Sequence, residues 1–245
     1  MAWLLIDNSN SRTKFAVGDR DRLHGWRAII PTAALDQKWL DGLLAGIDFS
    51  AVIVASVVPD KAAFLTAYFH MLPKFHLLGY QSPLEMEFDL PKPDQIGSDR
   101  MANAVGMKKL YGCPGIAIDF GTAVTFSYVS AEGNFSGGAI APGMAVMTKS
   151  LGSHTALLPE IVLNEPDTAI GKSTLEAMRI GAVIGSRGMV REILREMIAE
   201  IGTKPVIVAT GGGAEFASRG LGEIDVIDPN LTLEGLRLIA GRVFQ

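Results

Sequence analysis

The chain is poor in cysteine, in histidine and in clustered positive charge. Cys113 is the single cysteine among 245 residues, so no disulfide framework can form within the chain, and an unpaired thiol fits a reducing compartment. The four histidines are scattered and do not show the spacing of a metal site. The formal net charge is −4 and no dense Lys/Arg cluster occurs, which argues against nucleic acid as a partner. These absences favour a small-molecule partner.

Long hydrophobic runs are also absent, although 48% of the residues are hydrophobic and the mean hydropathy is +0.27. No uninterrupted apolar stretch reaches the roughly 18 residues that a bilayer-spanning helix needs. Asp7 and Asn8 interrupt the first apolar run, so the N-terminal residues do not show the pattern of a secretory signal. We therefore expect a cytoplasmic protein that does not enter a membrane.

Two stretches, residues 4–17 and 116–129, share one pattern. In each, an apolar run ends in an aspartate, Asp7 or Asp119, and a turn of small hydroxyl, amide or glycine residues leads into a second run of strand-forming residues. This pattern predicts a β-hairpin with a carboxylate at its mouth. Backbone N–H groups and hydroxyls in such a turn can approach an anion, and the aspartate can hold a cation beside it. Phosphate with a metal ion is therefore the ligand that the pattern favours.

The repetition of this hairpin predicts two similar lobes that face each other across a nucleotide, because internal self-similarity marks repeated architecture. Residues 1–113 are expected to form an N-terminal lobe with the phosphate-binding hairpin, and residues 114–245 a C-terminal lobe whose closing helix can pack back on the first. This plan is similar to that of the actin, Hsp70 and sugar-kinase superfamily. The expected fold class is α/β, with two duplicated actin-like (ribonuclease H-like) lobes whose mixed sheets are flanked by helices.

Periodicity and turn residues order the remaining elements. In the first half they predict the order β-β-β-α-β-α-β, with Thr32 capping the first helix. The expected ranges after the first hairpin are strands at 23–30, 51–58 and 75–78 and helices at 33–44 and 59–71. In the second half we expect strands at 133–140, 205–209 and 224–227. The expected helices are one after Gly143, a long helix from the 171–174 segment to Ile201, a short helix from Ala214 and a closing helix at 231–243.

The segment Gly97-Ser98-Asp99-Arg100 precedes apolar residues at helical spacing, so Asp99 and Arg100 are placed at a helix start. One interpretation is a cap, in which Ser98 or Asp99 accepts hydrogen bonds from the first N–H groups of the helix. The other is a carboxylate base beside a guanidinium that grips an anionic substrate. Both interpretations can hold at once.

The segment Gly171-Lys172-Ser173 superficially matches a Walker phosphate loop. That loop requires a glycine five positions before the Gly-Lys pair, and this chain has Pro166 there, so we reject the match. A different glycine cluster, Gly211 to Gly213, follows an expected strand and is a candidate wall beside a nucleotide.

The long helix carries Ala177, Gly181 and Gly185 at four-residue spacing. These small side chains present a smooth surface to which a second helix can come close. Either a helix crossing within the chain or a contact in a symmetric dimer would use it, and the sequence leaves both open.

Taken together and in this order, five segments resemble the type III pantothenate kinases over essentially the whole chain. The segments are residues 7–14, 97–100, 119–125, the glycines 137–138 with 142–143, and 171–174. The resemblance implies ATP-dependent phosphorylation of the primary hydroxyl of pantothenate, the first step toward coenzyme A. It also implies an actin-like fold, a homodimer, and a monovalent cation, K⁺ or NH₄⁺, besides ATP with Mg²⁺.

The resemblance also implies roles for individual residues. Asp99 looks like the general base, and Gly97, Ser98, Asp99 and Arg100 look like the pantothenate-binding segment, together with Thr174. Asp119 is similar to the ligand of the monovalent cation, and Thr122 to an ATP contact. The first hairpin corresponds to the ATP-binding phosphate turn, made of Asp7, Asn8, Ser9, Asn10, Ser11, Arg12, Thr13 and Lys14. We further expect Asp7 to help position Mg²⁺, which retains several waters when bound.

Two positions depart from the family pattern. Ser9 stands where the first turn usually has a glycine, and its Cβ restricts positive φ and thereby the shape of the phosphate turn. Leu90 stands where a tyrosine is common ahead of the 97–100 segment. Two alternatives therefore remain beside pantothenate kinase: a kinase of the same superfamily for another small hydroxylated acid or sugar, and a non-catalytic nucleotide-binding relative that acts through partners.

Overall fold

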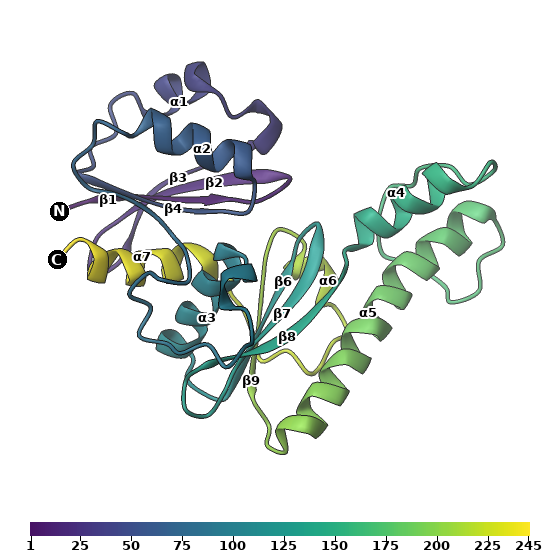
Figure 1. The fold of residues 1–245 in the computed structure, drawn as a ribbon. Helices are drawn as coiled ribbons and strands as arrows, with labels where there is room; N and C mark the ends of the chain where they lie inside the picture. The colour runs from purple at the N-terminus through teal and green to yellow at the C-terminus, as the bar shows by residue number, and fades with distance from the viewer. The chain divides into compact units, whose positions relative to one another are not determined.

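The computed structural model describes residues 1–245, which divide into two compact units. The first unit comprises Met1–Cys113, Val129–Gly137 and Asn230–Gln245, and the second comprises Pro114–Tyr128 and Gly138–Pro229. The chain forms two five-stranded sheets flanked by helices, which confirms the expected α/β class (Figure 1). The last helix of the chain thus belongs to the same unit as the first strands.

The first sheet contains five strands: β1 (Trp3–Asn8), β2 (Arg12–Gly18), β3 (Leu23–Pro31), β4 (Ala51–Ser56) and β5 (Phe75–Leu77). Their order across the sheet is β3-β2-β1-β4-β5, so β1 is central and pairs antiparallel with β2 and parallel with β4. At the carboxyl end of β1, Asp7 is opposite Lys14, and Asn8 is opposite both Thr13 and Ser56. The register therefore brings polar residues of three neighbouring strands together at the edge of the sheet formed by the strand ends, where β1 and β4 finish and β2 begins.

Four α-helices belong to the first unit: α1 (Gln37–Leu44), α2 (Pro59–Tyr68), α3 (Ser98–Leu110) and α7 (Leu231–Val243). Helices α1 and α2 cover the face of the sheet that carries Leu4 and Ile6, and their side chains share one buried core. Because side chains alternate along a strand, Trp3 and Asp7 face the other side. On that side α7 contacts β1 and α3 contacts β4, and the Trp3 ring lies 6.2 Å from the ring of Phe244.

Helices α3 and α7 pack against each other through two glycines. A Cβ on Gly106 would lie 2.9 Å from the backbone oxygen of Leu231, and one on Gly235 would collide with the carbonyl of Ala102. Backbones can approach this closely only where no side chain separates them.

The second sheet contains β6 (Gly115–Phe120), β7 (Ala123–Val129), β8 (Phe135–Pro142), β9 (Val206–Thr210) and β10 (Val226–Ile227), in the order β10-β9-β6-β7-β8. The second unit also contains three α-helices: α4 (Met144–His154), α5 (Thr174–Ile201) and α6 (Ala214–Ala217). Val190 and Leu194 of α5 join the core of this sheet. The N-terminal half of α5 instead extends beyond the sheet beside α4 (Figure 1). None of the helices is both long and apolar enough to cross a lipid bilayer.

The structure corrects the expected start of the first helix. Thr32 begins a short 3-10 turn, Thr32–Ala34, and α1 starts only at Gln37. The cap of α1 is Asp36, whose carboxylate accepts the N–H of Trp39 at 2.8 Å. The strand expected at 133–140 is shifted to Phe135–Pro142, whereas the closing helix has the expected limits.

The packing of α3 on α7 predicts that Gly235→Ala lowers the free energy of unfolding by about 2–3 kcal/mol, because the new methyl group forces the two backbones apart. Gly42→Ala is the matched control: it is also helical, but its Cβ would meet no atom within 4 Å. We expect this control to gain about 0.5–1 kcal/mol from helix propensity. Urea titrations of both variants measure the difference, and equal stabilities would contradict the packing.

Candidate active site

The first hairpin places an ion pair beside its turn. Asp7 is 2% exposed, and its Oδ2 lies 3.2 Å from Nζ of Lys14 on the neighbouring strand. The hydroxyl of Ser9 donates to the other carboxylate oxygen at 3.1 Å. A carboxylate has about four lone-pair positions, so these contacts leave it capacity to hold a hydrated cation. The lysine supplies positive charge at the same point.

The turn between β1 and β2 closes with a hydrogen bond from the N–H of Ser9 to the carbonyl of Arg12 at 3.1 Å. Glu85 is the one non-glycine residue with positive φ, so Ser9 does not adopt that conformation. Its Cβ therefore imposes no backbone strain, although a glycine was expected at this position.

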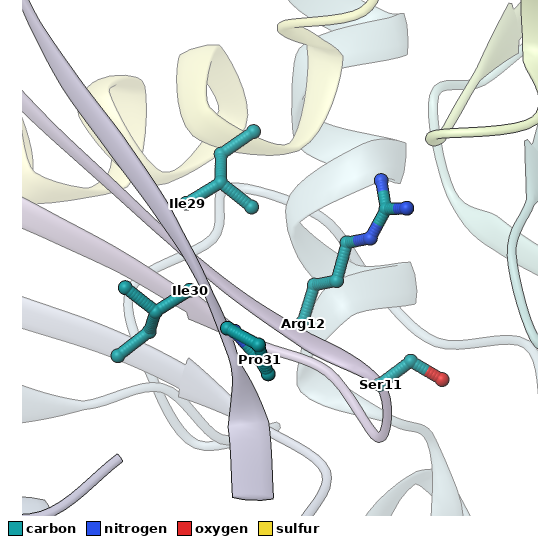
Figure 2. A pocket seen from close by; sticks show the side chains of 5 residues that line it. All are labelled: Ser11, Arg12, Ile29, Ile30 and Pro31. Atoms are coloured by element: carbon teal, nitrogen blue, oxygen red, sulfur yellow. The ribbon is translucent and has the colours of Figure 1, made fainter. Parts of the chain in front are cut away.

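A concavity of about 360 Å³ lies beside this turn, lined by Ser11, Arg12, Ile29, Ile30 and Pro31. Figure 2 shows Ser11 at the turn and the Arg12 guanidinium reaching out on the same side as Ile29. Ile29 is 60% exposed although it is a large apolar residue. The concavity thus combines a cation, a hydroxyl and an apolar wall, which suits an anionic ligand with an apolar part.

The start of α3 is anchored to the end of β4. Gly97 is the N-cap residue, and the Ser98 hydroxyl donates to the carbonyl of Ser56 at 3.0 Å. Ser98, expected together with Asp99 as an acceptor for the first N–H groups, is not the cap, because Gly97 holds that position and no side-chain cap hydrogen bond forms there. Asp99 does accept the N–H of Arg100 at 2.7 Å. Since Ser56 lies opposite Asn8, this anchor brings Asp99 to the sheet edge where the first hairpin turns.

Arg100 is held by an aromatic ring. Its guanidinium carbon lies 5.3 Å from the ring centre of Phe135, which is fully buried. Burial lowers the pKa of Arg100 from its usual range, and the negative charge of Asp99 opposes that shift. Phe135 is itself fixed by backbone hydrogen bonds with Glu87 and Asp89, at 2.9 and 3.0 Å. No local sequence pattern indicates this contact, because Phe135 lies on β8, 35 residues after Arg100.

Leu90, the second departure from the family pattern, also lies near β8. Its Cδ2 is 3.8 Å from the position of a Cβ on Gly137, which has a φ of +110°. The side chain is half-buried.

In the second unit, three glycines surround the second hairpin. Gly211 has a φ of +92°, and a Cβ there would collide with the Asp119 carboxylate. Gly143 donates its N–H to the carbonyl of Thr122 at 3.0 Å, and Gly213 donates to that of Phe120 at 2.9 Å. Asp119 is half-buried and Thr122 is exposed. The glycines at 211 and 213 thus pack against the end of β6. That this cluster forms a wall beside a nucleotide stays a prediction.

Thr174 is the first residue of α5, and its side chain is exposed. The preceding Ser173 accepts the N–H of Glu176 at 3.2 Å, and the Glu176 carboxylate accepts the N–H of Lys172 at 2.7 Å. The two bonds differ from a capping box only in that Glu176 accepts the N–H of the residue before the N-cap instead of that of Ser173 itself. The local role of residues 171–174 is therefore to start a helix, consistent with rejecting a Walker loop.

Comparison with known proteins identifies the family. A family model described as type III pantothenate kinase matches residues 3–196. The chain belongs to the type III pantothenate kinases. A type III pantothenate kinase from Akkermansia muciniphila is 47% identical over 241 residues, which cover 98% of this chain and 99% of that protein. The family expected from the five sequence segments is thereby confirmed.

Solved structures agree with this family's expected fold. The ROK hexokinase from Thermus thermophilus has a TM-score of 0.54 at 12% identity, covering 98% of each chain. An archaeal actin homologue has a TM-score of 0.53 at 11% identity, covering 99% of this chain and 100% of that one. At these identities the likeness concerns the fold alone, and it confirms the expected duplicated actin-like lobes.

The contact of Gly211 with Asp119 predicts that Gly211→Ala is costly in this type III pantothenate kinase. Gly220→Ala is the matched control, since Gly220 also has positive φ (+74°) but open space around it. The control should lose about 1–2 kcal/mol from backbone strain alone. Gly211→Ala should lose roughly 2 kcal/mol more, because its methyl group displaces the carboxylate. Thermal and urea unfolding measure both, and equal losses would show that the Asp119 contact is unimportant.

Proposed function

We propose that this chain transfers the γ-phosphoryl group of ATP to the primary hydroxyl of pantothenate and so produces 4′-phosphopantothenate, in the first step of coenzyme A biosynthesis. Membership of the type III pantothenate kinases supports this substrate. The single structural observation that carries the proposal is the anchoring of Ser98 to Ser56, opposite Asn8. It brings a candidate base and a candidate phosphate turn to one sheet edge.

Asp99 acts as the base in this proposal. Phosphoryl transfer passes through a loose transition state, so the carboxylate orients the hydroxyl of pantothenate and accepts its proton late. The Arg100 guanidinium, fixed over Phe135, binds the carboxylate of pantothenate as part of the 97–100 segment. A rigid cation placed in this way costs little conformational entropy when the substrate binds.

The first hairpin binds the phosphates of ATP. Lys14 and the donors of residues 8–13 offset the charge on the transferring group. The buried Asp7 carboxylate would hold Mg²⁺ through water, because its contacts with Lys14 and Ser9 do not use all its lone pairs. When bound, Mg²⁺ neutralises phosphate charge. Thr122 contributes an ATP contact, and Thr174 a contact to pantothenate.

A monovalent cation, K⁺ or NH₄⁺, is proposed at Asp119. The chemistry of the donors fits, because the carboxylate ends β6 where the backbone carbonyls of Phe120 and Thr122 also lie. Oxygen ligands of this kind suit K⁺. Such an ion would add positive charge at the hairpin mouth of the second unit.

Asp99→Asn tests the proposed base. Pantothenate-dependent release of ADP should be present in the wild-type protein in potassium buffer, weaker in sodium buffer, and about 10²–10⁴-fold slower in the variant. Asp94→Asn is the control, since Asp94 is an exposed acid of the preceding 3-10 turn, and should keep wild-type turnover. Undiminished turnover in Asp99→Asn would refute the base, and wild-type turnover with other acceptors alone would refute pantothenate.

We also propose a homodimer that uses the N-terminal half of α5. Gly181 and Gly185 are exposed, and a Cβ on either would meet no atom within 4 Å, so no helix of this chain crosses there. Ile184 between them is 44% exposed, and Leu157 in the segment after α4 is 89% exposed. Exposed apolar groups beside a smooth helix face favour association with a second copy.

Ile184→Glu should convert the dimer to a monomer, because it buries a charge in the proposed interface. Glu200→Lys, an exposed charge change at the other end of α5, should leave the dimer intact. Sedimentation equilibrium gives both masses. A wild-type monomer, or a variant that remains a dimer, would contradict this interface.

A cytoplasmic location is proposed as well. The single unpaired thiol of Cys113 supports it, because reducing compartments keep thiols free. The phosphoryl donor, ATP, is also supplied in that compartment.

A further inference from the structure

Thr32 lies directly beneath the turn of the first hairpin. Its side chain is 3% exposed, and its hydroxyl donates to the carbonyl of Ser9 at 2.6 Å. Its backbone N–H donates to the carbonyl of Ser11 at 3.1 Å. Thr32 alone therefore donates hydrogen bonds to two carbonyl groups of the turn.

A chain of buried hydrogen bonds fixes the direction of that hydroxyl. The single hydrogen of the Thr32 hydroxyl goes to Ser9, so Thr32 accepts from Thr13 at 3.0 Å. Thr13 has then used its own hydrogen and accepts from Nδ2 of Asn8 at 2.8 Å. The oxygen of the same amide accepts from Ser56 at 2.6 Å. Each hydroxyl and amide in this hydrogen-bond series donates to one neighbour and accepts from another in a consistent order.

The direction of the Ser9 carbonyl determines where the next N–H group points. In a planar trans peptide, the C=O and the following N–H point in opposite directions. Because Thr32 holds the Ser9 carbonyl toward the protein interior, the N–H of Asn10 points away from it. An anion-binding turn needs this arrangement, since an outward carbonyl would repel phosphate and an outward N–H attracts it.

We propose that Thr32 is a positioning residue for ATP: its hydroxyl holds the carbonyl of Ser9 inward and so presents the N–H of Asn10 to the phosphates. The inference rests on the proposed role of the first hairpin in binding ATP. Thr32 itself does not touch the nucleotide. Its effect is specific to the phosphate turn, so it concerns affinity for ATP rather than for pantothenate.

The test compares Thr32→Val with Thr32→Ser. Valine keeps the shape and the backbone N–H but removes the hydroxyl, whereas serine retains the hydroxyl. We expect Thr32→Val to weaken ATP binding about tenfold, measured by calorimetry without pantothenate, and to raise the KM for ATP by a similar factor. The KM for pantothenate should change less than about twofold, and Thr32→Ser should restore ATP binding to near the wild-type value.

Thr232→Val controls for a general loss of stability. Thr232 is also buried, and its hydroxyl donates to Asn103 at 2.8 Å within the same unit. This variant should lose a comparable amount of thermal stability and keep wild-type ATP affinity. If Thr32→Val does not fold, Thr32→Cys replaces it in the comparison with Thr32→Ser, because a thiol is a weak donor.

Three results would overturn the inference: wild-type ATP affinity in Thr32→Val, equal losses in the valine and serine variants, or an equal loss in Thr232→Val. Wild-type protein that binds ATP but does not phosphorylate pantothenate would refute the proposed substrate alone, and the calorimetric comparison would still decide the role of Thr32. Wild-type protein that binds no ATP would overturn both proposals.

Discussion

The pairing of β1 with two neighbouring strands at once is the constraint on which the candidate site depends. Because β2 and β4 both match the register of β1 up to its last residue, Asp7 and Asn8 end the strand beside polar partners on each side. Alternation then sends the two side chains to opposite faces. Asp7 meets Lys14 on the face toward α7, while Asn8 meets Thr13 and Ser56 on the face toward α1. If the pairing register of β1 shifted by one residue, Asp7 and Asn8 would change faces. The Asp7–Lys14 ion pair would then no longer lie on the face toward α7.

The two hairpins look alike in sequence, yet they are supported by different means. The first turn rests on side-chain hydroxyls and an amide, with Thr32 and Asn8 buried beneath it. The second rests on backbone contacts that only glycine allows, from Gly143 and Gly211. This difference explains how Ser9 is accommodated without strain. Where buried hydroxyls form hydrogen bonds to the backbone of a turn, a residue with positive φ is not needed to shape that turn.

The parts of the fold that were predictable are those encoded by neighbours along the chain. The paired hairpins and the closing helix follow from alternation and helical periodicity, which are local signals. Thr32 was misassigned as a helix cap because its partner, Ser9, lies 23 residues earlier. The ring of Phe135 under Arg100 and the glycine contact of α3 with α7 were equally invisible. Such contacts depend on which segments meet in space, and one sequence does not contain that information.

The first unit draws on both ends of the chain, since α7 packs on α3 and β1. During synthesis the strands and α3 emerge from the ribosome long before the last residues are made, and translation adds only about 5–20 residues per second. Until then the face of β1 that carries Trp3, and the glycine seam of α3, lack their covering helix. All residues of the second unit have been synthesised once Pro229 is added, so the folding of this unit does not depend on α7. The unit that begins first on the ribosome is therefore the one that finishes folding last, and truncated chains would expose its hydrophobic face to chaperones and proteases.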